Sequence, residues 1–132
     1  MNTLKAIVTK IDSADNLNIV SFDYFGEKLS MMSLDLNENI HVGTVVELST
    51  KSTNIAVAKE FSGSVSYSNQ IKTKIIGLEK GQLLSSVKLQ LNDSVLESII
   101  TLNSLKKMDL KVGDEILAFI KASDLSILKV IS

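Results

Sequence analysis

The sequence predicts an all-β protein made of two tandem, small, OB-like Greek-key β-barrels, each with one short helical turn. Three observations lead to this fold class. The chain repeats itself, its apolar residues alternate with polar ones over short stretches, and turn residues separate those stretches. With 132 residues, the chain has room for one ordinary domain or two very small ones.

The repeat appears when the chain is shifted along itself by 67 residues, which places Asn2 on Asn69. One extra residue near Asp93 and two more near Ser104 then raise the shift to 70 for the rest of the second copy. A tandem copy of a small unit favours an architecture in which the two units bury apolar faces against each other.

The repeat predicts a first domain over residues 1–60, a linker over residues 61–68 and a second domain over residues 69–132. A domain of about 65 residues buries only ~60% of its unfolded surface and is marginally stable alone. The chain has no cysteine, so disulfides cannot compensate. We therefore expect packing between the two halves or between chains.

A period of two dominates the hydrophobic pattern. Ser86–Leu91 alternates polar and apolar residues without interruption, and Val20–Tyr24 alternates in the first copy. Such alternation is typical of strands with one buried face. The expected strands are Leu4–Ile11, Leu17–Tyr24, Lys28–Leu34, Val45–Lys51, Ile55–Ala58, Ile71–Glu79, Leu83–Leu91, Val95–Leu102, Glu115–Lys121 and Leu125–Val130.

Turn residues separate these strands. Phe25-Gly26-Glu27 and Asn92-Asp93 favour tight hairpin connections between the second and third strands of the two copies. Gly43 and Gly113 occupy equivalent places before the fourth strand, where a glycine adopts a positive φ at little cost.

One short helical turn is expected between the third and fourth strands of the second copy, over residues Asn103–Met108, with Asn103 or Ser104 as its cap. The first copy is shorter at this place, so its turn is expected to be less regular. Five short strands with one helical turn are typical of a small barrel of the oligonucleotide/oligosaccharide-binding kind.

Composition argues against several functional classes. Without cysteine there is no thiolate metal site and no cysteine nucleophile. The single histidine, His41, has no evident acid–base partner, and carboxylates such as Glu97 are expected to lie on the surface. We therefore expect a protein that is not an enzyme and that has no side-chain site for a metal ion.

Charge and hydropathy limit the partners. All 14 basic residues are lysine, the net charge is −1, and the aromatic residues are four phenylalanines and two tyrosines. Nucleic-acid binding needs a basic face and stacking aromatic rings, so no nucleic-acid partner is expected. The N-terminus does not resemble a secretory signal, and no stretch approaches the ~20 apolar residues that span a bilayer. We expect a soluble, cytoplasmic protein without a membrane partner.

Polar side chains recur at equivalent places in the two copies. Ser, Thr and Asn supply neutral donors, Lys supplies a charge, and small residues leave backbone N–H groups accessible, with no carboxylate required nearby. This inventory can hold a compact, deprotonated oxyanion, although solvated strand faces and strand ends also carry such residues. The recurring residues are Asn2, Ser33, Lys51, Ser52 and Thr53 in the first copy, and Ser66, Ser68, Asn69, Ser98, Thr101, Lys121, Ala122 and Ser123 in the second.

Four segments of the second copy resemble, in their order, the motifs of the molbindin (Mop) family of transport-associated oligobinding (TOBE) domains. They are Ser66–Gln70, Ile99–Thr101, Met108–Gly113 and Ile120–Ser123. The resemblance covers nearly all of the second copy and, through the repeat, most of the first copy in weaker form. It implies tandem Mop domains of the TOBE fold that bind molybdate or tungstate.

The resemblance also implies how such a protein works. Duplicated molbindins are homotrimers that bury oxyanions at subunit interfaces, and the implied role is non-catalytic storage, buffering or homeostasis of molybdenum. The alternative is a ligand-responsive regulatory module that acts through a partner protein. The implied oxyanion-binding residues are Ser66, Ser68, Asn69, Thr101, Lys121, Ala122 and Ser123 in one pocket, and Lys51, Ser52 and Thr53 with Ser33 in its counterpart.

Two departures from the family pattern bear on these sites. Ser68 stands where the family has an arginine, which removes a charged, bidentate donor. Ser52 stands where the family has an alanine. The first departure removes donors from one pocket, and the second adds a hydroxyl to the other.

Overall fold

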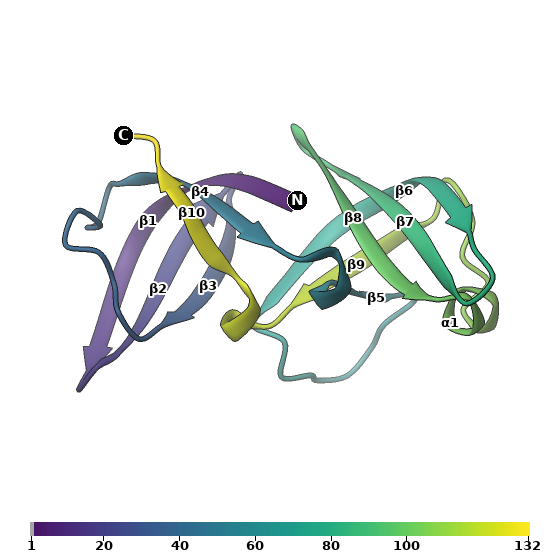
Figure 1. The fold of residues 1–132 in the computed structure, drawn as a ribbon, viewed down its shortest axis with the longest axis horizontal. Helices are drawn as coiled ribbons and strands as arrows, with labels where there is room; N and C mark the ends of the chain where they lie inside the picture. The colour runs from purple at the N-terminus through teal and green to yellow at the C-terminus, as the bar shows by residue number, and fades with distance from the viewer. Residues whose placement is uncertain (1) are drawn as a thin grey trace.

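The computed structural model describes residues 2–132 and contains two curled, antiparallel sheets of five strands each (Figure 1). This architecture confirms the predicted all-β fold class. The strands are β1 (Asn2–Ala14), β2 (Leu17–Tyr24), β3 (Glu27–Ser33), β4 (Val45–Thr50), β5 (Ala56–Ala58), β6 (Asn69–Lys80), β7 (Leu84–Leu91), β8 (Ser94–Thr101), β9 (Glu115–Ile120) and β10 (Ser126–Val130). Three helical turns accompany them: η1 (Ser52–Asn54), α1 (Leu102–Lys107) and η2 (Ala122–Asp124).

The two halves of the chain exchange their last strands. The sheet orders are β10-β4-β1-β2-β3 and β5-β9-β6-β7-β8, so each sheet takes its fifth strand from the other half. Figure 1 shows β10 lying along β4 and β5 lying along β9. Residues 59–68 connect β5 to β6. The predicted division into residues 1–60 and 69–132 therefore splits the sequence into its two repeats. It does not separate the sheets, because each sheet contains strands from both parts.

The strand registers correct the expected place of the insertions. Ile19 pairs with Met32 in the first half and Ser86 pairs with Ile99 in the second, so the shift of 67 holds through the third strand. No residue is inserted near Asp93, because both hairpins have two-residue connections between their strands. All three extra residues lie between β8 and β9, where the second half forms α1.

Two glycines adopt the backbone conformation that the sequence predicts. Gly43 and Gly113 have φ angles of 96° and 98°, which only glycine adopts without strain. Their N–H groups donate to the carbonyl oxygens of Val8 and Ile75, each at 2.8 Å. These bonds fix the chain on β1 and β6 just before the fourth strand begins.

Helix α1 begins earlier than predicted and uses a different cap. The side chain of Thr101 accepts a hydrogen bond from the backbone N–H of Ser104 at 3.1 Å, so Thr101 is the N-cap rather than Asn103 or Ser104. A cap must be extended and must reach the N–H three residues ahead. Thr101 meets both conditions because it ends β8. The buried side chain of Leu105 then packs the helix against the core. The first half has no helix here.

The apolar core is continuous across the two halves. Leu4, Val20 and Leu48 of the first half belong to the same buried cluster as Ile71 and Leu89 of the second. The expected burial of apolar faces between the halves is therefore present within a single chain, and strand exchange makes each half part of the core of the other.

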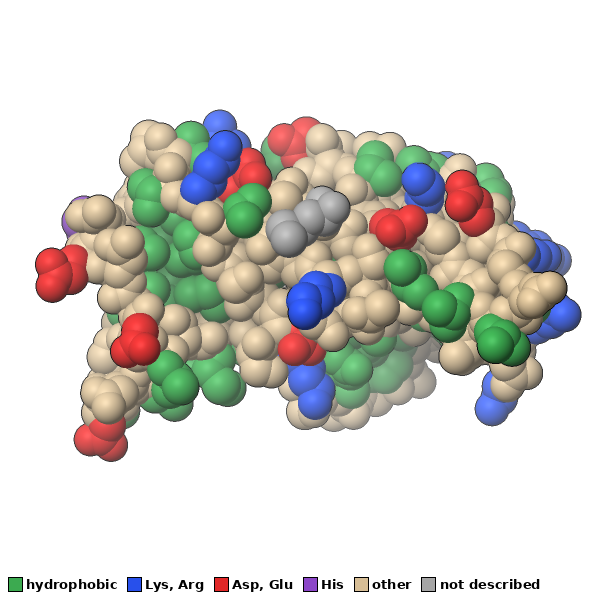
Figure 2. Space-filling view, in the orientation of Figure 1, with side chains coloured by type: hydrophobic (Ala, Val, Ile, Leu, Met, Phe, Trp, Pro, Cys, Tyr) green, Lys and Arg blue, Asp and Glu red, His purple; other side chains and the backbone are tan. Residues whose placement is uncertain are grey.

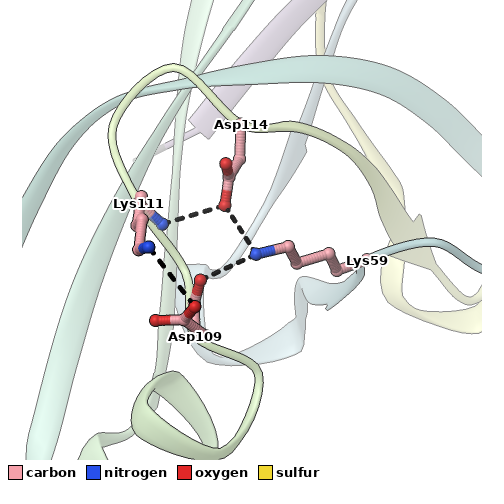
Figure 3. A network of polar contacts seen from close by, with 4 residues as sticks. All are labelled: Lys59, Asp109, Lys111 and Asp114. Carbon is pink, nitrogen blue, oxygen red and sulfur yellow. Dashed lines mark hydrogen bonds and ion pairs between the residues drawn. The ribbon is translucent and has the colours of Figure 1, made fainter.

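A polar network anchors β5 on the second half (Figure 3). The ammonium of Lys59, which follows β5, lies 3.1 Å from the Asp114 carboxylate and donates to the carbonyl oxygen of Asp109 at 2.7 Å. The backbone N–H of Lys111 also donates to Asp114, at 2.9 Å. These contacts hold the pKa of Asp114 below its ordinary value of 3.8, the Lys111 N–H being the larger cause and Lys59 the next.

Candidate functional site

The two lysine motifs lie at equivalent places, in the middle of the molecule where the halves meet (Figure 1). Residues 51–53 follow β4 and lead into η1, which packs against β8 of the other half. Residues 121–123 follow β9 and lead into η2, which packs against β3. We call these places the Lys51 site and the Lys121 site. Each is built from both halves because the chain crosses over after the fourth strand.

Two asparagines join each half to the third strand of the other. The side-chain oxygen of Asn69 accepts from the N–H of Ser30 at 2.7 Å, and its amide donates to the carbonyl oxygen of Ser30 at 2.9 Å. Asn2 makes the same pair of bonds with Glu97, at 2.7 and 2.9 Å. A carboxamide offers one acceptor beside donors, so it pairs with a backbone as another strand would. Asn69 is completely buried.

The Lys51 site contains a carboxylate. Ser52 donates to one oxygen of Glu97 at 3.1 Å and Ser86 donates to the other at 2.6 Å. We call Ser52, Ser86 and Glu97 the Glu97 clasp. Hydrogen bonds from Ser86, and then from Ser52, lower the pKa of Glu97, so its side chain is ionised at neutral pH. The expectation that this pocket needs no nearby carboxylate is wrong here, and Glu97 is not a free surface group.

The Lys121 site has a different composition. Ala122 and Ser30 occupy the places of Ser52 and Glu97, because the registers relate residue 122 to 52 and residue 97 to 30. The Lys121 side chain is exposed and forms no ion pair with any other residue in the range 2–132.

The residues around the start of β6 also lie near the Lys121 site. Asn69 pairs with Ile120, so Ser68 and Lys121, which flank that pair, lie at the same end of the sheet. The side-chain nitrogen of Asn69 donates one hydrogen bond to Ser30, and its second N–H has no partner within residues 2–132. The structure therefore brings Ser68, Asn69 and Lys121 together with Ala122 and Ser123. Ser66 is exposed two residues earlier in the connection.

Four other predicted residues have different surroundings. Thr101 caps α1 and donates to the Ser104 hydroxyl at 2.9 Å, at the end of β8 that pairs with Leu84. Within one chain, Thr101 therefore does not join the Lys121 site. Ser98 is buried and donates to the carbonyl oxygen of Ile55 at 2.6 Å. Ser33 lines a cavity of about 310 Å³ beside β10. Thr53 is exposed in η1.

Three cavities, with volumes of about 550, 340 and 310 Å³, are lined by residues other than 51–53 and 121–123. Both lysine motifs lie on open surface at the junction of the halves. On the face in Figure 2, lysine and acidic side chains are interspersed. In residues 2–132 there is no group of three His, Cys, Asp or Glu side chains that could hold a metal ion. No helix in that range is long and apolar enough to cross a membrane.

Sequence analysis missed the Glu97 clasp. The expected insertion near Asp93 misaligned Glu97 with its counterpart Ser30. The difference between a carboxylate in one copy and a hydroxyl in the other was therefore not apparent from the sequence. The contact between Ser52 and Glu97 also depends on strand exchange, which periodicity cannot reveal. An uninterrupted shift of 67 is the sequence signal that pairs Glu97 with Ser30.

The chain is similar in sequence to one domain family and to shorter proteins that contain a single copy of the repeat. The TOBE domain matches residues 66–127. Molybdenum-pterin-binding protein 1 of Clostridium pasteurianum is 39% identical over 66 residues, which are 49% of this chain and 97% of that protein. The probable molybdenum-pterin-binding protein of Haemophilus influenzae is 33% identical over 64 residues, which are 48% of this chain and 93% of that protein. Each of these relatives corresponds to about half of this chain.

A solved structure matches both halves together. The cytoplasmic molybdate-binding protein ModG, crystallised with molybdate bound, has a TM-score of 0.89 and 22% identity, over 96% of this chain and 94% of that one. At this identity the likeness establishes the fold, which includes both sheets. Together with the sequence relatives, it confirms the resemblance stated above. The chain belongs to the molbindin (Mop) family of TOBE-domain proteins.

Proposed function

We propose that this protein binds molybdate or tungstate without catalysis and stores or buffers it in the cytoplasm. The observation that carries the proposal is the Lys121 site, where an ammonium with no ion-pair partner in residues 2–132 lies at the same end of the sheet as the exposed hydroxyls of Ser68 and Ser123. The printed names of the relatives and the molybdate in ModG support the choice of ligand. These oxyanions are tetrahedral dianions, which accept hydrogen bonds on every side.

The donors available at this site are sufficient for useful affinity. Lys121, Ser123, Ser68 and the Ala122 backbone could supply about four hydrogen bonds, each contributing roughly 1.5–3 kcal/mol to a charged partner. Association costs about 4–15 kcal/mol, so the sum is compatible with micromolar binding. The missing arginine at Ser68 lowers this total, because an arginine would add a bidentate, charged contact.

We further propose that a second chain completes the site and that the protein is a homotrimer. The lysine motifs are open in one chain, whereas an oxyanion that is held tightly needs donors on all sides. Large apolar side chains also remain on the surface, among them Leu34, Val42, Leu83 and Val112, which are 62–81% exposed. A second subunit that packed over these side chains would remove them from water, which is favourable.

Isothermal titration calorimetry with molybdate, tungstate and sulfate tests the function. We expect heat of binding with the first two anions at micromolar concentration. Weaker binding of sulfate is expected because it is a smaller anion. Static light scattering of the same samples should give three times the chain mass. No heat with any of the three anions would rule out the function while leaving the fold and the family unaffected.

A further inference from the structure

The two lysine sites differ at every position of the Glu97 clasp. By strand register, Ser86 corresponds to Ile19, and the other two clasp residues correspond to Ala122 and Ser30. The Lys121 site therefore lacks the carboxylate and both of the hydroxyls that would hold one. One substitution alone could be incidental, but all three positions differ in the direction that removes the clasp.

The Glu97 carboxylate occupies donors that an oxyanion would need. It is itself an oxyanion, and each of its oxygens accepts a hydroxyl hydrogen bond. The amide of Asn2 is also fully used, because it donates to Ser52 at 3.2 Å and to the Glu97 carbonyl oxygen at 2.9 Å. At the Lys121 site, by contrast, Ser30 stands where Glu97 would, so no carboxylate occupies the donors there. A dianion approaching the Lys51 site therefore meets a fixed negative charge and no vacant donor on Asn2 or Ser52.

We propose that Glu97 is an internal occupant that closes the Lys51 site to oxyanions. Each chain then has one working site, the Lys121 site, and one site that its own carboxylate fills. This inference rests on the proposed function, since it assigns that function to one half of the repeat. It also names Glu97 as the residue that sets the number of ligands bound.

Calorimetry with molybdate on the purified full chain tests this inference by the number of anions bound per chain. The wild type is expected to bind one. Glu97→Ser, which installs the residue found at position 30, should bind two, and Glu97→Ser combined with Lys51→Ala should return to one. In the reverse experiment, Ser30→Glu combined with Ala122→Ser and Ile19→Ser, which installs all three clasp residues, should bind none. Circular dichroism and thermal melting verify that each variant is folded.

Glu38→Gln is the matched control for Glu97→Gln, because both remove one negative charge and Glu38 is exposed in the loop between β3 and β4. We expect one anion per chain for the control and two for Glu97→Gln. Two anions per chain in the wild type, or one in a folded Glu97→Ser variant, would overturn the inference and leave the proposed function intact. No binding in either protein would overturn both.

Discussion

Lys121 provides the one charged donor in the proposed site, and its ammonium is not neutralised by any acidic side chain in residues 2–132. Its backbone is extended, with φ −67° and ψ 146°, which ends the strand pairing and starts η2. Lys51 has a similar backbone, with φ −81° and ψ 145°. The two sites therefore share their main-chain geometry, and the side chains around them decide what each can bind.

Lys121→Ala should weaken molybdate binding by about 10- to 100-fold, since one hydrogen bond to a charged partner is lost. Lys129→Ala is the matched control, because Lys129 is an exposed lysine on β10 away from both lysine motifs. Titration calorimetry of both variants measures the effect. Equal affinities for the two variants would show that Lys121 does not contact the anion.

Asn69→Ala should lower the free energy of unfolding by about 2–4 kcal/mol, because the N–H and C=O of Ser30 would both lose their partner in a buried place. Urea unfolding measures the change. Asn103→Ala, at an exposed position of α1, should change the free energy by less than about 0.5 kcal/mol. An equally small change in the free energy of unfolding for Asn69→Ala would show that water replaces the hydrogen bonds of the Asn69 side chain without loss of stability.

At the scale of the strands and turns, exchange is the feature that joins the two halves. β5 has only three residues and pairs with β9 through Ala56, Val57 and Ala58. So short a strand needs further anchoring, which Lys59 supplies through Asp114 and the carbonyl oxygen of Asp109 (Figure 3). On the first half, β10 runs beside β4, and Thr50 donates to the carbonyl oxygen of Asp124 at 2.9 Å.

The anchor of β5 predicts a pH dependence of stability. The folded pKa of Asp114 lies below 3.8, so its ionised form stabilises the fold above the unfolded pKa. That contribution is lost as the pH falls below about 3.8 and through the folded value. Urea unfolding between pH 5 and about pH 2 should therefore show a steeper loss of stability for the wild type than for Asp114→Asn. Parallel curves would contradict this account.

Strand positions were predictable from the sequence, but the contacts between the halves were not. All ten expected strands are present within a few residues, since alternation and turn residues are local signals. The cap at Thr101 was missed because β8 ends where the helix begins, and propensity alone favoured the next polar residues. Which sheet receives β5 or β10 depends on packing between distant segments, so strand exchange and the Glu97 clasp could not be predicted.

At the scale of the whole molecule, the two sheets share one core and two exchanged strands, so neither half is complete without the other. The Lys51 and Lys121 sites exist only because of that exchange, which places each lysine motif on the third strand of the other half. In the proposed assembly, the same repeat that builds the fold also produces two sites of unequal character.

Shared strands predict that the chain unfolds in one cooperative step. Urea unfolding followed by far-ultraviolet circular dichroism and by tyrosine fluorescence should give coincident transitions, because removing either half leaves the other without its fifth strand. Tyr24 is buried in β2 of the first half, and Tyr67 stacks on Phe119 in β9 of the second half, so the two rings report on both halves. Two separate transitions would show that each half is stable without the exchanged strand.

The central claim is that a tetrahedral metal oxyanion is bound beside Lys121, Ala122 and Ser123 and excluded beside Lys51. A crystal structure of the protein with tungstate, using the anomalous scattering of tungsten, tests it most directly. The account predicts a strong anomalous peak within hydrogen-bond distance of Ser123 and the Lys121 ammonium, and no peak at the Glu97 clasp. A peak beside Lys51, or no peak near Lys121, would contradict it.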